Sequence, residues 1–388
     1  MFAPLEAPMK DFAWGSIGAI SAFRGRAASR ALEAEQWFGG HPRSGTRIFQ
    51  GVGETEFSGW LAEKGIDFPL LVKLLAASQP LSIQVHPSQT QAREGFFAEE
   101  QREPSQISAP RNYSDASAKP ELIICLSASF TALVGFITTE MLAQRVSRWE
   151  AAGLDSSALR MVKRLLDQSL RERVEWLLSG DRDVVQCVAE VSAWSLSGLD
   201  ASIRGEVLLE HRVMSALAAA HPGDSGILFG LLMHHVSLAQ GEALFVDSGV
   251  VHAYLQGVGL EVMLPSDNVV RAGLTSKHID RDEFLSLASL EPISSPPFVA
   301  PQDIGHSLLY AGFPAGFSVH KMTRGGHISL GGSFAIVLSD GACGKVSGGE
   351  SSLDVTPGQV FFATASEAEL RFEGEGTLWI VCTEGEEG

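Results

Sequence analysis

The sequence predicts a mostly β protein with one helical insertion. Short apolar stretches rich in Val, Ile and Phe, separated by turns with Gly or Pro, are typical of strands and occur in both the N-terminal and the C-terminal part. Between them, residues 138–221 contain no Pro and place Leu, Val and Met at helical spacing. A linker with three prolines at 292–297 precedes the last strand-like region. Because 388 residues exceed one ordinary domain, we expect two or three.

Composition and charge exclude several classes of function. With 45% hydrophobic and 19% charged residues, the chain can build packed cores and carries too little charge for a disordered protein. Its net charge of −17 argues against a nucleic-acid partner. The N-terminus lacks a basic segment followed by an apolar core, and no run of about 18 apolar residues occurs. We therefore expect neither a secretory signal nor a membrane span.

The four cysteines give no sign of a metal motif or a disulfide framework. They stand far apart, and no CxxC pair exists, so zinc-finger and thioredoxin-like interpretations fail. A reduced compartment is the default for such a chain, and we expect a cytoplasmic protein. The residues are Cys125, Cys187, Cys343 and Cys382.

The individual elements follow from local patterns. Lys73 is the only charge in the first apolar stretch, where a Lys either lies at an edge or faces a cavity and meets an anion. The polar segment 90–113 predicts a helix and then a loop. The final region has no cluster of His and acidic residues, so we interpret it as structural. The expected strands include 68–75, 81–87, 122–126, 131–136, 227–233, 236–238, 317–321, 334–338, 359–363 and 377–381.

The stretch Leu-Ser-Ile-Gln-Val-His-Pro at 81–87 is a candidate for half of a metal site. Side chains alternate along a strand, so Gln84 and His86 point to one face while Ile83 and Val85 point to the other. An amide oxygen and an imidazole on one face can bind a metal ion. Taken alone, the stretch favours a plain strand whose His faces water at its end, and the rest of the chain has to decide.

A second motif suggests where the other ligands come from. Gly241, Gly249 and His252, on a strand, a tight turn and a strand, resemble the second motif of the cupin superfamily, which places a His inside a small β-barrel. Two positions depart from that pattern: Asp247 replaces the usual Pro and Gln256 replaces a common Asn. In the first cupin motif, HxH precedes a Glu. Here Gln84 and His86 replace HxH, and Glu121 lies 35 residues after His86, which fits a long insertion between strands.

The detailed resemblance is to the type I mannose-6-phosphate isomerase (phosphomannose isomerase) family. LSIQVHP, KPEL, GVVHAYLQG and SDNVVRAGLT occur in the family's order, and Trp14-Gly15 and WFGGHPR at 37–43 resemble its N-terminal motifs. The resemblance spans about residues 1–285, while the C-terminal region agrees in type and length. It implies a cupin (jelly-roll) β-barrel catalytic domain of residues 1–137 and 222–285, an all-α inserted domain of 138–221, and a C-terminal cupin-like β domain of 286–388.

The resemblance also implies a cofactor and a reaction. The family binds one zinc ion, whose ligands here would be Gln84, His86, Glu121 and His252. Zinc accepts imidazole nitrogen and carboxylate oxygen, and an exchangeable position would make it a Lewis acid for a sugar oxygen. The family interconverts mannose 6-phosphate and fructose 6-phosphate by moving a proton between C1 and C2 through an enediol(ate).

Such a reaction needs a proton carrier, an electrophile and an anion site. Arg271 and Lys119 are the basic residues of the matching motifs, and we predict both to be catalytic. Arg stays protonated and suits an electrophile or anion clamp, whereas a Lys near a cation can transfer protons. Which group removes the carbon proton stays open. The predicted substrate-binding residues are Ser82, Lys73, Trp14, Tyr254, Glu261 and Asp267.

One residue departs from the family pattern, and two alternative functions stay open. Ala118 stands where family members often carry a His before the Lys of the KPE motif, which bears on rate or substrate preference. The alternatives are a non-catalytic cupin that binds a sugar phosphate and another metal-dependent cupin enzyme, such as an iron oxygenase with a facial His/carboxylate triad. For partners, we expect a small sugar phosphate, no nucleic acid and no membrane, with the chain a monomer or weak homo-oligomer.

Overall fold

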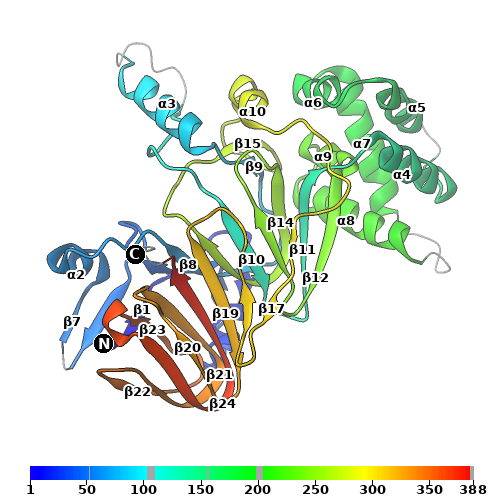
Figure 1. The fold of residues 1–388 in the computed structure, drawn as a ribbon. Helices are drawn as coiled ribbons and strands as arrows, with labels where there is room; N and C mark the ends of the chain where they lie inside the picture. The colour runs from blue at the N-terminus through cyan, green and yellow to red at the C-terminus, as the bar shows by residue number, and fades with distance from the viewer. Residues whose placement is uncertain (52, 103–109, 155–156, 198–203, 385–388) are drawn as a thin grey trace.

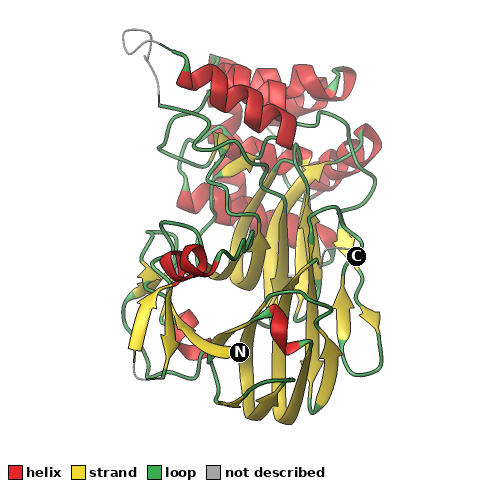
Figure 2. Cartoon of the chain, turned by 60° about the vertical axis from the view of Figure 1, so that its left-hand side comes forward, coloured by secondary structure: helices red, strands yellow, loops and turns green. Residues whose placement is uncertain are grey.

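The computed structural model consists of two large sheets and a group of helices (Figures 1 and 2). It describes residues 1–51, 53–102, 110–154, 157–197 and 204–384. The mostly β class with a helical segment, predicted from the sequence, is confirmed. None of the described helices is long and apolar enough to cross a membrane.

The first sheet holds most of the strands from the central part of the chain. Its main path runs β16-β13-β10-β14-β8-β5-β2. Strands β9 and β11 also pair with β14, and they continue to β15 and β12, respectively. The described pairings do not close into a barrel and are consistent with a cupin-like domain. The strands are β2 (Met9–Lys10), β5 (Glu35–Gly39), β8 (Leu71–Ala77), β9 (Ile83–Val85), β10 (Glu121–Cys125), β11 (Ser129–Phe136), β12 (Met233–Ala239), β13 (Ala243–Val246), β14 (His252–Met263), β15 (Val270–Gly273) and β16 (Phe298–Val299).

The long strand β14 serves two sets of neighbours. Its first half pairs with β11 and β9, and its second half pairs with β8 and β10. The change occurs at Gly257, whose φ of 130° lies in a region that favours glycine. A Cβ there would also lie 2.7 Å from the carbonyl oxygen of Ser129. Glycine is thus required where β14 passes from one set of partners to the other.

The second sheet unites both ends of the chain. Its order is β17-β18-β19-β24-β21-β23-β1-β6-β7, with β20 on β24 and β22 on β21. Figure 1 shows the N-terminal strands beside the C-terminal ones. The strands are β1 (Phe2–Glu6), β6 (Arg47–Gln50), β7 (Gly53–Glu56), β17 (Gln302–Asp303), β18 (Leu308–Tyr310), β19 (Phe317–Thr323), β20 (Gly326–Ser329), β21 (Ala335–Ser347), β22 (Ser352–Val355), β23 (Val360–Ala363) and β24 (Glu369–Thr383).

This sheet corrects one predicted domain limit. Residues 2–6 and 47–56 belong to the C-terminal sheet and not to the catalytic part, because β1 pairs antiparallel with β23 and β6 extends the sheet from β1. Leu5 of β1 joins the same apolar core as Phe362. A sequence pattern cannot reveal such a pairing between residues more than 300 positions apart. With this amendment, we retain the three-domain division as a proposal.

The helices form a layer against the site-bearing part of the first sheet. Ile83 and Val85 of β9 share one apolar core with the helices of the insertion. Two helices of this group begin with side-chain caps, at Thr138 and Ser169. The helices of the group are α4 (Thr139–Ala151), α5 (Ser157–Arg164), α6 (Leu170–Ser179), α7 (Arg182–Leu196), α8 (Glu206–Ala220) and α9 (Gly226–Leu232).

Shorter elements complete the chain. A two-stranded sheet pairs β3 with β4, and 3-10 turns occupy 165–167 and 365–367. Helix α3 begins at a capping box formed by Ser88 and Gln91, as the polar segment after residue 90 predicted. These elements are β3 (Ser16–Ile17), β4 (Leu32–Glu33), α1 (Ala19–Phe23), α2 (Phe57–Lys64), α3 (Gln89–Glu100) and α10 (Arg281–Leu287).

One predicted strand is wrong. Residues 227–233 were expected to be extended, but 226–232 form helix α9, and only Met233 begins a strand. Every residue of α9 is buried, so the run is apolar on all sides and has no period that separates a helix from a strand. The side chain of Asp224 accepts the backbone N–H of Gly226 and thereby stabilises a helical start.

A buried arginine joins the helices to the first sheet. The Arg145 side chain donates to the carbonyl oxygens of Gly230, Leu231 and Met233, at the point where α9 passes into β12. Its Nε also donates to the Glu210 carboxylate at 3.0 Å. These bonds satisfy the terminal carbonyls of α9, which have no partner within the helix.

We predict that Arg145→Met destabilises the protein by about 3 kcal/mol, because buried carbonyls and a buried carboxylate lose their donor. Urea unfolding followed by circular dichroism measures the change. The control is Lys163→Met, which removes an exposed ion pair with Glu150 and should cost less than about 1 kcal/mol. Equal stability of the two variants would contradict the role of Arg145.

Candidate metal centre

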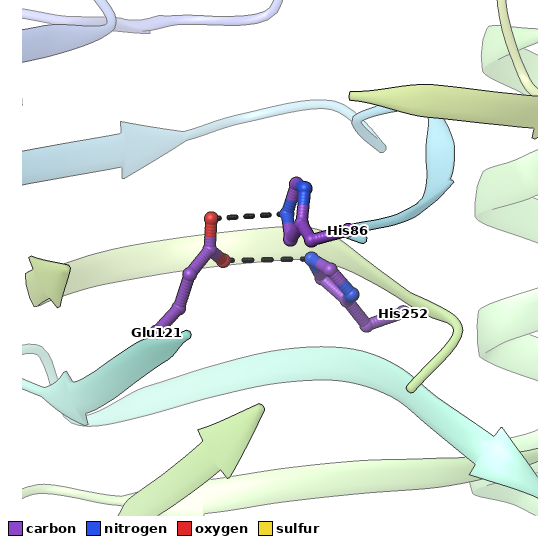
Figure 3. Close-up of side chains that lie close together, drawn as sticks. All are labelled: His86, Glu121 and His252. Carbon is purple, nitrogen blue, oxygen red and sulfur yellow. Dashed lines mark ion pairs between the residues drawn. The ribbon is translucent and has the colours of Figure 1, made fainter. Parts of the chain in front are cut away.

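Three buried side chains converge in the first sheet. One nitrogen each of His86 and His252 and one carboxylate oxygen of Glu121 lie within 4.8 Å of one another. Figure 3 shows both imidazoles facing the two carboxylate oxygens. His86 Nε2 is 3.1 Å from Glu121 Oε1, and His252 Nε2 is 3.4 Å from Glu121 Oε2. The three residues are at most 1% exposed.

Strand ends position these groups. Glu121 is the first residue of β10, His252 is the first of β14, and His86 directly follows β9. The backbone N–H of Gly249 donates to the carbonyl of His86, which ties the turn before His252 to the end of β9. Glu121 follows His86 by 35 positions, and α3 lies between them, as an insertion between strands requires.

Backbone carbonyls fix the orientation of both imidazoles. Nδ1 of His86 lies 2.7 Å from the carbonyl oxygen of Asn268, and Nδ1 of His252 lies 3.0 Å from that of Val250. Because a carbonyl oxygen only accepts, each Nδ1 carries the proton and each Nε2 presents a lone pair to the cluster. This is the arrangement that metal-binding histidines usually adopt in proteins.

Charge in the cluster also suits a cation. Burial, together with the Lys119 ammonium, lowers the pKa of His86 to about 4, so its imidazole is neutral at pH 7. Burial would raise the pKa of Glu121, but Lys119 and His86 hold it well below its usual value. The cluster therefore offers a neutral imidazole and an ionised carboxylate, which are the forms that bind metals.

The residues fit one divalent metal ion. His86 Nε2 is buried and makes no hydrogen bond, which is costly for a polar atom without a ligand. Nitrogen and oxygen donors of this kind, without thiolates, suit zinc bound at about 2.0–2.2 Å. The side-chain amide of Gln84 lies 3.3 Å from His252 Nε2, and a 180° rotation of the amide presents its oxygen there. Its role as fourth ligand stays a prediction.

Strand register places Arg271 beside this centre. His252 of β14 lies opposite Gln84 of β9, and Gln84 lies opposite Arg271 of β15. Directly opposite residues point to the same face of a sheet, so the three side chains form a row across neighbouring strands. Within the described residues, the Arg271 guanidinium has no hydrogen bond or ion pair, and burial lowers its pKa.

Two further predicted residues contact the carboxylate of Glu121. Lys119 Nζ lies 2.9 Å from Oε1, and the hydroxyl of Tyr254 donates to Oε2 at 3.0 Å. Both side chains are buried. Burial and the Glu121 carboxylate raise the pKa of Tyr254, so the phenol keeps its proton. Lys119 and Tyr254 thus each contact one carboxylate oxygen of the candidate metal ligand Glu121.

Lys73 and Glu261 form a buried ion pair next to the centre. Their Nζ and Oε2 are 2.8 Å apart, and Glu35 lies 4.0 Å from the same ammonium. Burial alone would lower the pKa of Lys73, but these carboxylates and Glu121 raise it above its usual value. The Lys73 ammonium also lies 4.9 Å from the centre of the Trp37 ring. Lys73 is therefore already neutralised, which weakens its assignment to a phosphate.

The remaining predicted residues lie around this core. Asp267 pairs with His41, at 3.2 Å, and with Arg43, and these bonds lower its pKa to about 2 although burial opposes them. Asp267 therefore connects the SDN motif to the WFGGHPR loop. Trp14 and Ser82 are half-buried, Trp14 against the apolar residues around Tyr254.

Sequence reasoning missed two residues of this region and left one without a role. Asn268 is fully buried, and its side chain binds the backbone of residues 114–117, so that its own carbonyl is fixed against His86. The Asn in SDN was a usable signal. Lys277 is an exposed residue, but partial desolvation of its amine, followed by the charge of Arg271, lowers its pKa. Ala118 is buried and its N–H donates to Gln89.

Comparisons with known proteins agree with this centre. Residues 2–138 match the phosphomannose isomerase type I catalytic domain. The mannose-6-phosphate isomerase of Salmonella typhimurium (strain LT2) is 32% identical over 393 residues, covering 95% of this chain and 96% of that protein. The human mannose-6-phosphate isomerase is 31% identical over 329 residues, covering 75% of this chain and 74% of that protein. The chain belongs to the type I phosphomannose isomerase family.

Solved structures extend the phosphomannose isomerase likeness to the whole fold. A zinc-bound mannose 6-phosphate isomerase has a TM-score of 0.85 at 29% identity, covering 99% of this chain and all of that one. A variant phosphomannose isomerase from Salmonella typhimurium has a TM-score of 0.86, also at 29% identity, with the same coverage. The helical group and the C-terminal sheet are therefore shared with phosphomannose isomerases.

We predict that His252→Ala abolishes stoichiometric metal binding by this phosphomannose isomerase, because it removes one of three donors from the cluster. Inductively coupled plasma mass spectrometry of zinc-loaded protein measures the metal content. His320→Ala is the control, since His320 lies in the C-terminal sheet on β19 and is bonded to Ser307. A His252 variant with full metal content would exclude the proposed ligand.

Proposed function

We propose that the protein is a zinc-dependent aldose–ketose isomerase that interconverts mannose 6-phosphate and fructose 6-phosphate. The observation that carries the proposal is the buried cluster of His86, Glu121 and His252 with both Nε2 lone pairs turned inward, in a chain of this family. The net charge of −17 and the absence of a spanning helix among the described residues are compatible with a protein of the cytoplasm that binds neither nucleic acid nor membranes.

We assign the metal ligands as Gln84, His86, Glu121 and His252. When bound, zinc supplies Lewis-acid polarisation of a sugar oxygen. The chain holds the ligands in their binding forms: the Asn268 and Val250 carbonyls keep the Nδ1 protons in place, and Lys119 keeps Glu121 ionised. Both imidazoles are thus oriented before the metal binds.

We assign the anionic end of the substrate to Arg271 and Lys277. Arg271 shares a face with Gln84 and has no carboxylate partner among the described residues, in contrast to Lys73. Burial lowers the pKa of Arg271, and burial followed by the charges of Arg271 and Arg43 lowers that of Lys277, although Glu35 opposes this. Two cations without a partner are suited to a phosphate, and Arg in particular can bind it through two parallel bonds.

We assign proton transfer to Lys119. Its ammonium lies within 3 Å of the metal ligand Glu121, so a substrate oxygen or carbon held beside the metal would be within its reach. Arg271 stays protonated and can only stabilise negative charge. Lys119 and the polar residues next to it are therefore the candidates for the group that abstracts the proton from carbon. The buried Lys73–Glu261 ion pair belongs to this neighbourhood.

The central test is turnover. Zinc-loaded protein incubated with fructose 6-phosphate should produce mannose 6-phosphate, detected by nuclear magnetic resonance, and a strong chelator should abolish the activity. A binding module would show affinity without conversion, and an oxygenase would consume oxygen. Intact, zinc-loaded protein that produces no mannose 6-phosphate would rule out the proposed function.

Lys119→Met should lower kcat by about a thousandfold, because the variant keeps the bulk of the side chain but cannot carry a proton. The metal content should stay near that of the wild type. Coupled assays at saturating fructose 6-phosphate give kcat, and Lys321→Met, a substitution in the C-terminal sheet, is the control. A loss of zinc in parallel with activity would instead indicate that Lys119 only supports Glu121.

A further inference from the structure

The segment between α8 and α9 is bonded to the chain next to both short strands of the site, just before β9 and just after β15. The carboxylate of Asp224 accepts three backbone N–H groups: Gly226 at 2.7 Å, Leu274 at 2.9 Å and Thr275 at 3.1 Å. His221, three residues earlier, donates from Nε2 to the carbonyl of Pro80 at 3.0 Å, shortly before β9. The helical insertion is thus bonded to the chain shortly before Gln84 and shortly after Arg271.

Close packing reinforces the Asp224 bonds. A Cβ on Gly226 would lie 2.6 Å from the backbone nitrogen of Leu274, and a Cβ on Gly273 would lie 2.6 Å from the Cα of Gly226. Leu274 adopts a left-handed φ of 54°, which is unfavourable for a leucine. A strained residue of this kind persists only where its surroundings impose it, and here Asp224 holds both its N–H and the next one.

The strained turn lies between two cations. Arg271 precedes it on β15 and Lys277 follows it, and neither side chain has an ion-pair partner within the described residues. The charge of Arg271 is among the causes that lower the pKa of Lys277, after burial, so the two cations lie close enough to repel each other. The backbone course of residues 271–277 contributes to how far apart they are.

We propose that Asp224 is a positioning residue that holds the 271–277 turn in the shape that presents Arg271 and Lys277 together to the anionic end of the substrate. The identity of that anion rests on the proposed function. Asp224 itself makes three hydrogen bonds to backbone N–H groups. It affects substrate binding indirectly, by positioning Arg271 and Lys277. The helical insertion thereby determines affinity for the phosphate.

The substitution Asp224→Asn tests this with little change in volume. Two of the three bonds go to Oδ1 and one goes to Oδ2, so an Asn can keep the first two only by facing its amide NH2 against the N–H of Thr275. The turn should loosen without loss of the fold. The matched control is Asp303→Asn in the C-terminal sheet, where the carboxylate accepts the N–H of Gly305.

The experiment compares zinc-loaded wild type, Asp224→Asn and Asp303→Asn. We expect Asp224→Asn to raise KM for mannose 6-phosphate and the Kd for inorganic phosphate by about tenfold, with kcat within about threefold of wild type and unchanged zinc content. The control should match the wild type. Unchanged KM and Kd would overturn the proposal, and so would a loss of kcat and zinc without a change in Kd.

A measurement on the wild type covers the case in which the variant fails to fold. Saturating inorganic phosphate should slow hydrogen exchange of the Leu274 and Thr275 amides, because the anion fixes the turn from the other side. Unaltered exchange would overturn the proposal. Failure of the proposed function can be distinguished from failure of this proposal. Wild type that binds fructose 6-phosphate without converting it would refute the isomerase function. The phosphate Kd of Asp224→Asn would still decide the role of Asp224.

Discussion

The burial of one carboxylate constrains the rest of this structure. Glu121 is 1% exposed and stays ionised, which a protein interior tolerates only with several compensating partners. The protein draws them from separate segments: Lys119 precedes β10, His86 follows β9, and His252 and Tyr254 belong to β14. Each segment must reach the same point, so the cluster fixes the relative positions of three strands. A metal ion bound by the histidines and Glu121 would complete the compensation.

Short strands explain why the helices are needed. Strand β9 has three residues and β15 has four, too few to be stable by their own pairing, and yet they carry Gln84 and Arg271. Ile83 and Val85 bury their side chains in the core of the helical insertion, and Arg145 and Asp224 bond its ends to the sheet. The helices therefore act as a support for site-bearing strands that the sheet alone would leave loosely held.

The sequence predicted the class of fold and the residues of the cluster, because strand periodicity and motif order are local and survive divergence. It could not predict which strands pair across more than 300 residues, such as β1 with β23, or the helical state of a fully apolar run such as α9. It also could not reveal the ion pair of Lys73, since a lone Lys in an apolar strand gives no indication of partners on other strands such as Glu261. Long-range electrostatic partners decide such roles, and composition does not reveal them.

The charge distribution shows how a protein with a net charge of −17 can receive an anion. Charges in solution are screened beyond about 10 Å, so the far acidic surface matters less to a bound phosphate than the nearest groups. Lys73 and Lys119 are paired with Glu261 and Glu121, and their charges are largely cancelled locally. Within the part of the chain that the structure describes, Arg271 and Lys277 have no ion-pair partner, and burial is the first cause that lowers the pKa of each. A phosphate bound there would supply the negative charge that the two cations lack. The affinity for the phosphate thus follows from the lack of ion-pair carboxylates next to Arg271 and Lys277 among the described residues.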